Sequence, residues 1–254
     1  MSDPVDRTSF DALVKPERPR LLAFAIRMVA DRQDAEDVVQ DALIKAYAAI
    51  DTFRGDAKLS TWLFAIVTRC CIDHLRSRRR WRDDAQHHTR ADPETPHDQV
   101  LVELARPGAR FEAREHIAFC FACVGRSLPA EEAAAVLLRE VFGFSNLEAA
   151  RMCDVSESVL RHRLSAGRGA MQDTFEGLCG LVAKTGVCHQ CAGLRERAPS
   201  ENRGEEVPDL AGDSAWSRRL RIVADADLAD GATAQLHRLM FRAVHDAEER
   251  ATRK

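Results

Sequence analysis

The chain has 254 residues, which suits one large domain or two small ones, and its formal net charge is −3. Charged residues make up 30% of it and aromatic residues 6%, and glycine (13) and proline (9) are scarce, so the composition favours helices over strands. No apolar run approaches the roughly 18 residues of a membrane span, and the N-terminus lacks a secretion signal. We therefore expect a cytoplasmic, all-α protein without membrane contact. If the net negative charge were spread evenly along the chain, it would argue against binding to nucleic acid.

The first segment of the chain has the pattern of three helices. Residues 20–30 form a short amphipathic stretch, and Asp34 is placed to cap a second helix with apolar residues at helical spacing. Residues 53–59 contain a glycine and predict a turn. Ser60 or Thr61 can then cap a third helix, which runs into a cluster of arginines.

Two polar stretches divide the rest of the chain. Residues 83–111 are predicted as a flexible linker, because 83–99 hold almost no apolar residue and 105–110 add a Pro-Gly break. A second polar connection covers 198–214. Beyond it, apolar residues at helical spacing begin with Trp216 and predict a folded tail.

Between these stretches lies a helix-turn-helix pattern. A helix that starts near Pro129 ends at Gly143, and Ser145 with Glu148 three residues later predicts a capping box for a short second helix. After a tight turn, Ser156 can cap a longer, basic third helix. Short helix, tight turn and longer basic helix is the order found in DNA-binding proteins.

The net charge hides a strong segregation along the chain. Residues 31–41 carry five acids against one arginine, and residues 69–82 carry six arginines against one aspartate. Runs of like charge are often only solvated faces. Here a basic run precedes a helix-turn-helix pattern, and the combination indicates phosphate contacts with nucleic acid, whereas the acidic face suits a basic protein partner.

These residues also resemble a known family. Residues 34–80 (DAEDVVQDALIKAYAAIDTFRGDAKLSTWLFAIVTRCCIDHLRSRRR) resemble region two of bacterial RNA polymerase sigma factors of the extracytoplasmic-function (ECF) type. Residues 128–171 (LPAEEAAAVLLREVFGFSNLEAARMCDVSESVLRHRLSAGRGAM) resemble region four. The resemblance implies two small helical domains joined by a flexible linker and followed by a mainly helical extension. The predicted bounds are 1–82 for region two, 83–111 for the linker, 112–178 for region four and 179–254 for the extension.

The resemblance implies that region two serves two partners. Its second helix would bind the largest subunit of core RNA polymerase through Glu36, Asp37, Gln40, Asp41, Leu43 and Ile44. The loop before its third helix would capture an unstacked base of the minus-ten promoter element, which needs a stacking or apolar wall and polar donors. The DNA-binding residues implied for region two are Arg54, Asp56, Lys58, Leu59, Ser60, Trp62, Arg69, Arg76, Arg78, Arg79 and Arg80, although an aromatic residue at the helical spacing of Trp62 is more often part of the core.

Region four would read the minus-thirty-five element in the major groove. The residues implied for this contact are Glu157, Ser158, Arg161, His162, Arg163 and Arg168, the last on phosphate. Val159, Leu160 and Leu164 are predicted as core. Gly167 and Gly169 lower the helix propensity beyond this point.

The resulting prediction is an alternative sigma factor that binds core RNA polymerase and promoter DNA, with an anti-sigma factor as a candidate partner. No nucleophile motif or paired carboxylate site accompanies these regions, so we expect no enzyme activity. The alternative is a metal- or redox-responsive helix-turn-helix regulator that does not bind the polymerase. That alternative leaves residues 34–80 without a role.

Eight cysteines in a chain without a secretion signal indicate reduced thiols. Cys120, Cys123, Cys188 and Cys191 could together form a four-thiolate site for zinc or another thiophilic metal. Alternatively, Cys179 could join the last two in a local site or a thiol switch, or Cys120 and Cys123 could simply be core residues. No cofactor is required for the predicted function, and the extension is predicted to regulate the sigma core in cis.

Overall fold

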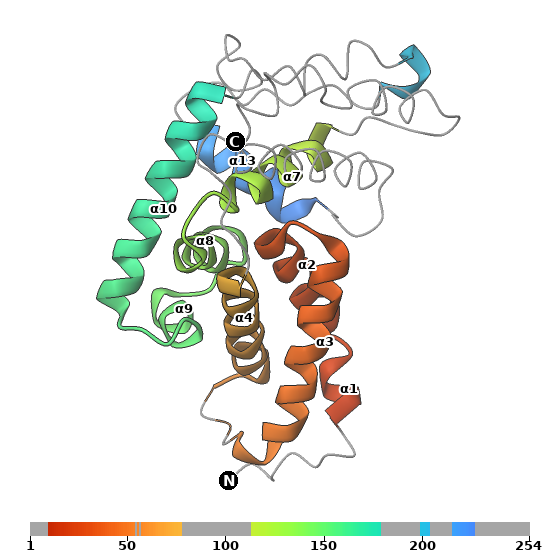
Figure 1. The fold of residues 1–254 in the computed structure, drawn as a ribbon, viewed down its shortest axis with the longest axis vertical. Helices are drawn as coiled ribbons and strands as arrows, with labels where there is room; N and C mark the ends of the chain where they lie inside the picture. Colours follow the sequence, from red (N-terminus) through yellow and green to blue (C-terminus); the bar gives the residue numbers. More distant parts are fainter. Residues whose placement is uncertain are drawn as a thin grey trace, which may run out of the picture. The chain divides into compact units, whose positions relative to one another are not determined.

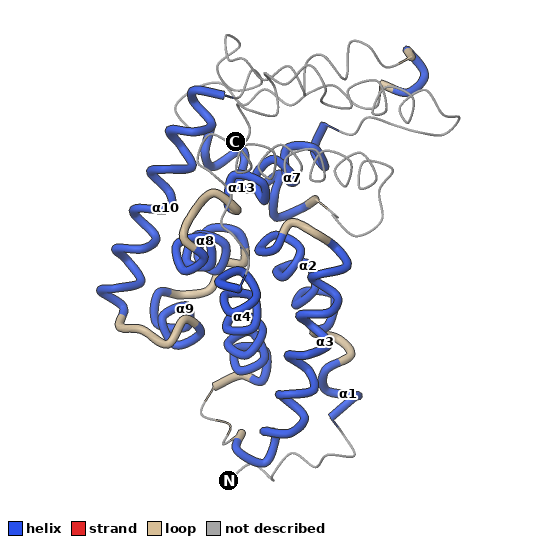
Figure 2. Tube along the Cα trace, viewed as in Figure 1, coloured by secondary structure: helices blue, strands red, loops and turns tan. Residues whose placement is uncertain are grey.

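The computed structural model describes residues 10–53, 55, 57–77, 113–178, 199–203 and 215–226. Every regular element in these ranges is a helix, which confirms the predicted all-α class for this part of the chain (Figure 2). Within the same ranges, no helix is both long enough and apolar enough to cross a bilayer. The chain forms two compact units, residues 1–80 with 129–167 and residues 81–128 with 168–254, and each is described by itself.

The first unit holds most of the helices (Figure 1). Its N-terminal elements are α1 (Phe10–Val14), α2 (Arg18–Val29), α3 (Arg32–Ala49), the 3₁₀ turn η2 (Ile50–Thr52) and α4 (Leu59–Ser77). Its second part holds α8 (Ala130–Val136), the π-helical turn η3 (Leu137–Val141), α9 (Asn146–Met152) and the first half of α10 (Glu157–Leu178). The second unit holds α7 (Ala113–Gly125), the end of α10, η4 (Ser200–Asn202) and α13 (Ala215–Asp225).

Two predicted helix starts are wrong by a few residues. Asp31, with an extended backbone, accepts a hydrogen bond from the backbone N–H of Asp34 at 2.9 Å, so Asp31 caps α3 and Asp34 lies in its first turn. Both residues are aspartates. Asp31 is the cap because its carboxylate reaches a backbone N–H of the first turn, three residues later, that has no partner within the helix. Helix α4 begins at Leu59, so Ser60 and Thr61 are already helical.

Aromatic side chains join the two parts of the first unit. The ring of Phe24 on α2 lies 5.6 Å from that of Phe64 on α4, and Phe142 lies 5.4 Å from Phe24. Phe144 packs 4.8 Å from Phe64, so the loop before α9 is held against α2 and α4. The guanidinium of Arg20 lies 5.2 Å from the Phe64 ring centre and donates to the Phe142 carbonyl at 3.0 Å. Burial of Phe24, Phe64 and Phe144 stabilises the unit by roughly 2 kcal/mol for each ring, which holds the segment around α9 beside α4.

Gly167 explains how α8 approaches α10 so closely. A Cβ atom at this position would lie 3.0 Å from Cγ2 of Val136 and 3.2 Å from the backbone oxygen of Glu132. The absence of a side chain therefore lets the two helices meet backbone to backbone. Helix α10 continues to Leu178 despite the lowered propensity, because packing outweighs about 1 kcal/mol of intrinsic preference.

In the second unit, helix α13 packs on α7 and on the end of α10. Phe121 of α7 stacks on Phe175 of α10 with ring centres 6.1 Å apart, and Trp216 of α13 lies 5.8 Å from Phe121. Arg219 of α13 is 2% exposed, and its guanidinium lies 3.7 Å from the centre of the Phe175 ring. The prediction of a folded segment beyond residue 214 is confirmed for α13.

Candidate nucleic-acid interface

Helix α3 presents an acidic and apolar stripe to solvent. The helix buries the side chains of Ala35, Val38, Val39, Ala42 and Ala46, which leaves the opposite face outside the core. The predicted polymerase-binding residues follow that outer face: Glu36, Asp37, Gln40 and Asp41 are exposed, Leu43 is half-buried and Ile44 is 60% exposed. Sequence reasoning missed Tyr47, which lies one turn beyond Ile44 and is 45% exposed. The sequence offered one signal for Tyr47, because a residue three positions after Ile44 lies on the same face of a helix.

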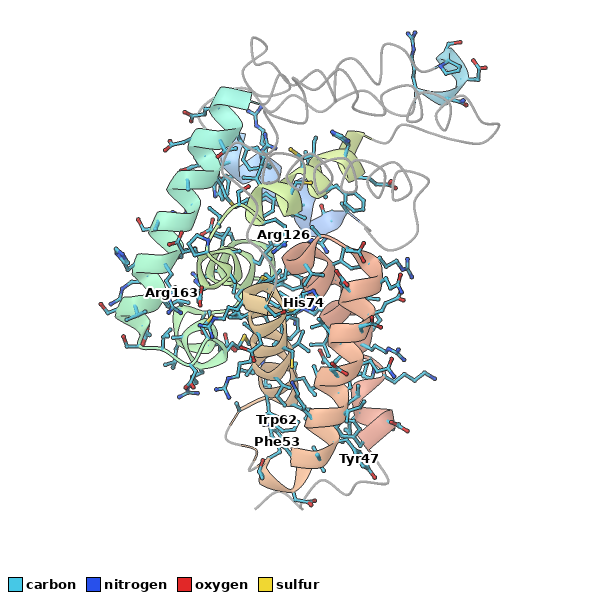
Figure 3. All side chains as sticks on the ribbon, viewed as in Figure 1. Tyr47, Phe53, Trp62, His74, Arg126 and Arg163 are labelled. Atoms are coloured by element: carbon cyan, nitrogen blue, oxygen red, sulfur yellow. The ribbon has the colours of Figure 1, made fainter. Side chains whose placement is uncertain are left out.

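The predicted base-capture loop lies between η2 and α4. Lys58 is exposed and Leu59 and Ser60 are half-buried, whereas Arg54 and Asp56 lie outside the described residues. Trp62 is half-buried against Phe53, with ring centres 5.4 Å apart, and Figure 3 shows the two side by side at one end of α4. A half-buried aromatic pair beside an exposed lysine offers a stacking surface with a cation next to it.

Two arginines on α4 pair with acids from the helix-turn-helix segment. Arg76 contacts Oε1 of Glu131 with its Nη2 at 2.6 Å and its Nε at 3.1 Å. Arg69 places Nη2 3.3 Å from Oδ2 of Asp154. Both arginines keep more than half of their side chains exposed. The other three arginines predicted for this surface, Arg78, Arg79 and Arg80, lie outside the described residues.

The surroundings of Glu131 favour its charged form. Burial by itself would raise the pKa of Glu131, but a backbone hydrogen bond at the start of α8, the contact with Arg76 and the positive charge of Arg163 lower it below its ordinary value. The positive charge of Arg163 therefore acts to lower the pKa of both Glu131 and Cys153. Arg163 is half-buried on α10 (Figure 3).

The predicted capping box at the start of α9 is present. The backbone N–H of Glu148 donates to Oγ of Ser145 at 3.2 Å, and the backbone N–H of Ser145 donates to Oε2 of Glu148 at 2.9 Å. The hydrogen bonds from Ser145 lower the pKa of Glu148, and the positive charges of Lys58 and Arg139 lower it further. Lys58, from the base-capture loop, is thus an electrostatic neighbour of α9.

The turn of the helix-turn-helix is formed by Asp154, which has a left-handed backbone (φ +56°) that aspartate tolerates better than most residues. Ser156 then caps α10 by accepting from the backbone N–H of Val159 at 3.3 Å. Among the predicted readers, Ser158, Arg161 and His162 are exposed and Glu157, Arg163 and Arg168 are half-buried. Arg161 approaches Glu157 at 3.8 Å on the same face.

Val159 is not a core residue, which corrects the sequence prediction. Leu160 and Leu164 are buried as predicted, but Val159 is 42% exposed. The two leucines are four residues apart and share one face of α10, and Val159 is rotated from that face by one helical step. It therefore lies among the candidate DNA readers.

Cys120 and Cys123 are half-buried on α7, one helical turn apart, and Cys188 and Cys191 lie outside the described residues. In the part of the chain that the structure describes, no three metal-ligating side chains come together. Burial raises the pKa of Cys153 to about 11, and burial with the neighbouring Cys70 raises that of Cys71 well above its ordinary value. The thiols of Cys71 and Cys153 are therefore in their inert form, which agrees with a structural role.

Comparison with known proteins decides the family. Residues 13–81 match Sigma-70 region 2, and residues 120–171 match Sigma-70 region 4. The chain is 32% identical over 174 residues to the RNA polymerase sigma-H factor of Pseudomonas aeruginosa, covering 68% of this chain and 89% of that protein. The chain belongs to the ECF family of RNA polymerase sigma factors.

A further relative of this sigma factor agrees with that family. The chain is 30% identical over 166 residues to the ECF RNA polymerase sigma factor SigM of Mycobacterium tuberculosis, covering 65% of this chain and 76% of that one. Among solved structures it is similar to the sigma factor RpoE of Bartonella quintana, crystallised with the anti-sigma factor NepR, with 26% identity, 66% and 98% coverage and a TM-score of 0.45. About a third of this sigma factor thus lies outside each of these alignments.

Proposed function

We propose that this ECF sigma factor binds core RNA polymerase through α3 and directs transcription from promoters whose minus-ten element is read by region 2 and minus-thirty-five element by region 4. The observation that carries the proposal is that each matched region has an exposed surface suited to its role. Region 2 has the stripe on α3, and region 4 has the outer face of α10. The alternative of a free-standing regulator is not favoured, because the family match includes region 2.

The stripe on α3 has the composition of a protein interface. Ile44 and Tyr47 supply an exposed apolar centre, and Asp37, Gln40 and Asp41 surround it with acidic and polar groups. An interface of this kind buries its apolar centre and uses the charged rim for steering. The partner that fits it is a basic helical surface of core polymerase.

The outer face of α10 suits direct reading of bases in a major groove. Arg161 can bind guanine through two hydrogen bonds, and Glu157 can accept from the amino group of cytosine. Val159 offers an apolar contact for the methyl group of thymine, which exists only on that base. These residues are close together on the first turns of the helix, as expected for a recognition helix.

The loop before α4 suits single-stranded DNA. Phe53 and Trp62 form an aromatic pair, and Lys58 is exposed beside them. Stacking on an aromatic ring offsets the few kcal/mol that base unstacking costs. Arg69 and Arg76 would hold the strand through its phosphates, which positions the DNA without reading its sequence.

The remaining properties follow from this role. A sigma factor supplies binding and positioning, so we propose no catalytic activity and no required cofactor, and we place the protein in the cytoplasm with the polymerase and the chromosome. An anti-sigma factor is a further candidate partner. The four-thiolate zinc site stays a prediction, which metal analysis of the purified protein tests.

In vitro transcription tests the proposal. Purified chain and core polymerase are incubated with a library of promoter fragments, and core polymerase alone is the control. Transcripts that depend on the chain and start at a shared sequence are expected. No transcript above the core-alone background would contradict the proposal, and co-purification with core polymerase separates a sigma factor from a regulator that binds DNA alone.

A further inference from the structure

A lysine of α3 contacts a cysteine of α4. Nζ of Lys45 lies 3.4 Å from Sγ of Cys70 and donates a hydrogen bond to it. Lys45 follows Ile44 of the stripe on α3, and Cys70 follows Arg69 on α4. An amine nitrogen and a thiol sulfur from two neighbouring helices are thus held together in the folded chain.

The partner of Lys45 is unusual for an exposed lysine. Sulfur is a weak hydrogen-bond acceptor, and a lysine ammonium is strongly hydrated. Asp41, a stronger acceptor, is exposed one helical turn earlier on α3. Among the described residues, the polar contact of Lys45 is nevertheless with the sulfur of Cys70. Two groups held in contact in this way react as if each were present at very high concentration.

Of the two adjacent cysteines on α4, Cys70 is the one that a small oxidant can reach. Cys70 is 8% exposed and Cys71 is fully buried. Burial, with the neighbouring Cys70, raises the pKa of Cys71 well above its ordinary value, which keeps that thiol neutral and inert. A disulfide between the two would be strained, because consecutive Cα atoms are about 3.8 Å apart and disulfides usually need at least about 4.4 Å. Lys45 is therefore the partner that the described structure offers to an oxidised Cys70.

We propose that Lys45 and Cys70 form a redox modification site, at which hydrogen peroxide leads to a nitrogen–sulfur bond between α3 and α4. In the first step, peroxide transfers one oxygen to the Cys70 thiol, which gives the sulfenic acid and water. In the second step, the Lys45 ammonium loses one proton to solvent and the amine attacks the sulfur. The sulfur–oxygen bond breaks, and the hydroxyl leaves as water with one hydrogen of the amine. The sulfur is oxidised by two electrons and the peroxide is reduced to water, and sulfenic acids condense with a backbone nitrogen in the same way.

The modification is reversible and changes the surface of α3. Two equivalents of a thiol reductant return the Cys70 thiol and the Lys45 amine and become a disulfide. While the bond is present, the positive charge of Lys45 is lost beside Ile44, and the stripe on α3 becomes more acidic. This effect on the polymerase-binding stripe rests on the proposed function, whereas the formation of the bond does not.

Peptide mass spectrometry of the folded full chain after treatment with hydrogen peroxide tests the proposal. In the variant Cys71→Ala, Cys70 is the sole cysteine of residues 70–76, which trypsin releases as one peptide. Because trypsin does not cleave after a modified lysine, the expected product is residues 33–54 joined to residues 70–76, with two hydrogens fewer than the sum of the two peptides. Dithiothreitol is expected to separate them again. If Cys70 gains only oxygen or a disulfide and cleavage after Lys45 stays complete, the proposal is overturned.

The matched control is Lys45→Arg in the same Cys71→Ala background. Arginine keeps the positive charge and the N–H donors, but it stays protonated and does not attack the sulfur. In this control we expect no joined peptide, and dimedone should trap the sulfenic acid on Cys70. Equal yields of the joined peptide from folded and from urea-unfolded Cys71→Ala would show that the contact between α3 and α4 does not direct the reaction. A joined peptide without any transcript contradicts the proposed function alone, and transcripts without a joined peptide contradict the modification site alone.

Discussion

Arg76 and Glu131 are 55 residues apart in the chain and form a two-donor ion pair in which Nη2 and Nε of the arginine approach one carboxylate oxygen at 2.6 and 3.1 Å. The pair joins the end of α4 in region 2 to the start of α8 in region 4. It places an arginine proposed to bind a DNA phosphate against a carboxylate of its own chain.

The Arg76–Glu131 pair makes stability depend on pH in the acid range. The pKa of Glu131 is lowered in the folded chain, so its contribution is fully present above its ordinary value of 4.5 and is lost as the pH falls through the folded pKa. Urea denaturation of the unaltered chain and of Glu131→Gln is expected to differ by about 1 kcal/mol or less at pH 7, because the Arg76 side chain is 62% exposed and solvent screens the pair. The difference should vanish in stronger acid, and an undiminished difference there would contradict the assignment.

Val159 should make binding sensitive to the thymine methyl group. In a minus-thirty-five duplex with deoxyuridine in place of thymine, loss of one buried methyl is expected to weaken binding by roughly fourfold, or about 0.8 kcal/mol. The variant Val159→Ser should show no such sensitivity. Gel-shift titration of both proteins on both duplexes measures the coupling. Equal sensitivity of the two proteins would place Val159 outside the base contacts.

Ile44 should be a main contact for core polymerase. The variant Ile44→Asp puts a charge at the apolar centre of the stripe on α3, and we expect a loss of about 2 kcal/mol in polymerase binding, or roughly thirtyfold. The matched control is Leu147→Asp, at an apolar residue of α9 that is also exposed. Co-purification or biolayer interferometry with core polymerase compares them. If Leu147→Asp lowered the affinity for core polymerase as much as Ile44→Asp does, the effect would not be specific to α3.

Arg219 should contribute by packing more than by charge. It is buried on the Phe175 ring, and its two Nη atoms have no hydrogen-bond partner among the described residues. Replacing an unsatisfied buried charge by an apolar side chain of similar volume is often neutral or stabilising, so Arg219→Leu should leave the thermal midpoint unchanged or raise it. Arg219→Ala should lower the midpoint, because it empties the site above Phe175. A midpoint that falls equally in both variants would indicate that the charge itself is required.

Features within one or two helical turns could be predicted from the sequence. The capping box of Ser145 and Glu148 is present, and Gly143 has the positive φ (+72°) of a residue that ends a helix. The outer stripe of α3 was also predictable, since an amphipathic helix exposes whatever lies opposite its apolar face. These features need only local spacing and backbone chemistry. The start of α3 was missed because Asp31 and Asp34 are equally good caps as residue types.

The tertiary structure decided what spacing cannot. Val159, Leu160 and Leu164 are all apolar, and the packing of α10 decides which side of the helix is buried, so that Leu160 and Leu164 face the core and Val159 is exposed. The sequence by itself determined the helices, the segregated charge and the family resemblance, because these depend on the order of residues along the chain. The tertiary structure alone brought Arg76 to Glu131, because a contact over 55 residues depends on how helices pack and not on any local pattern.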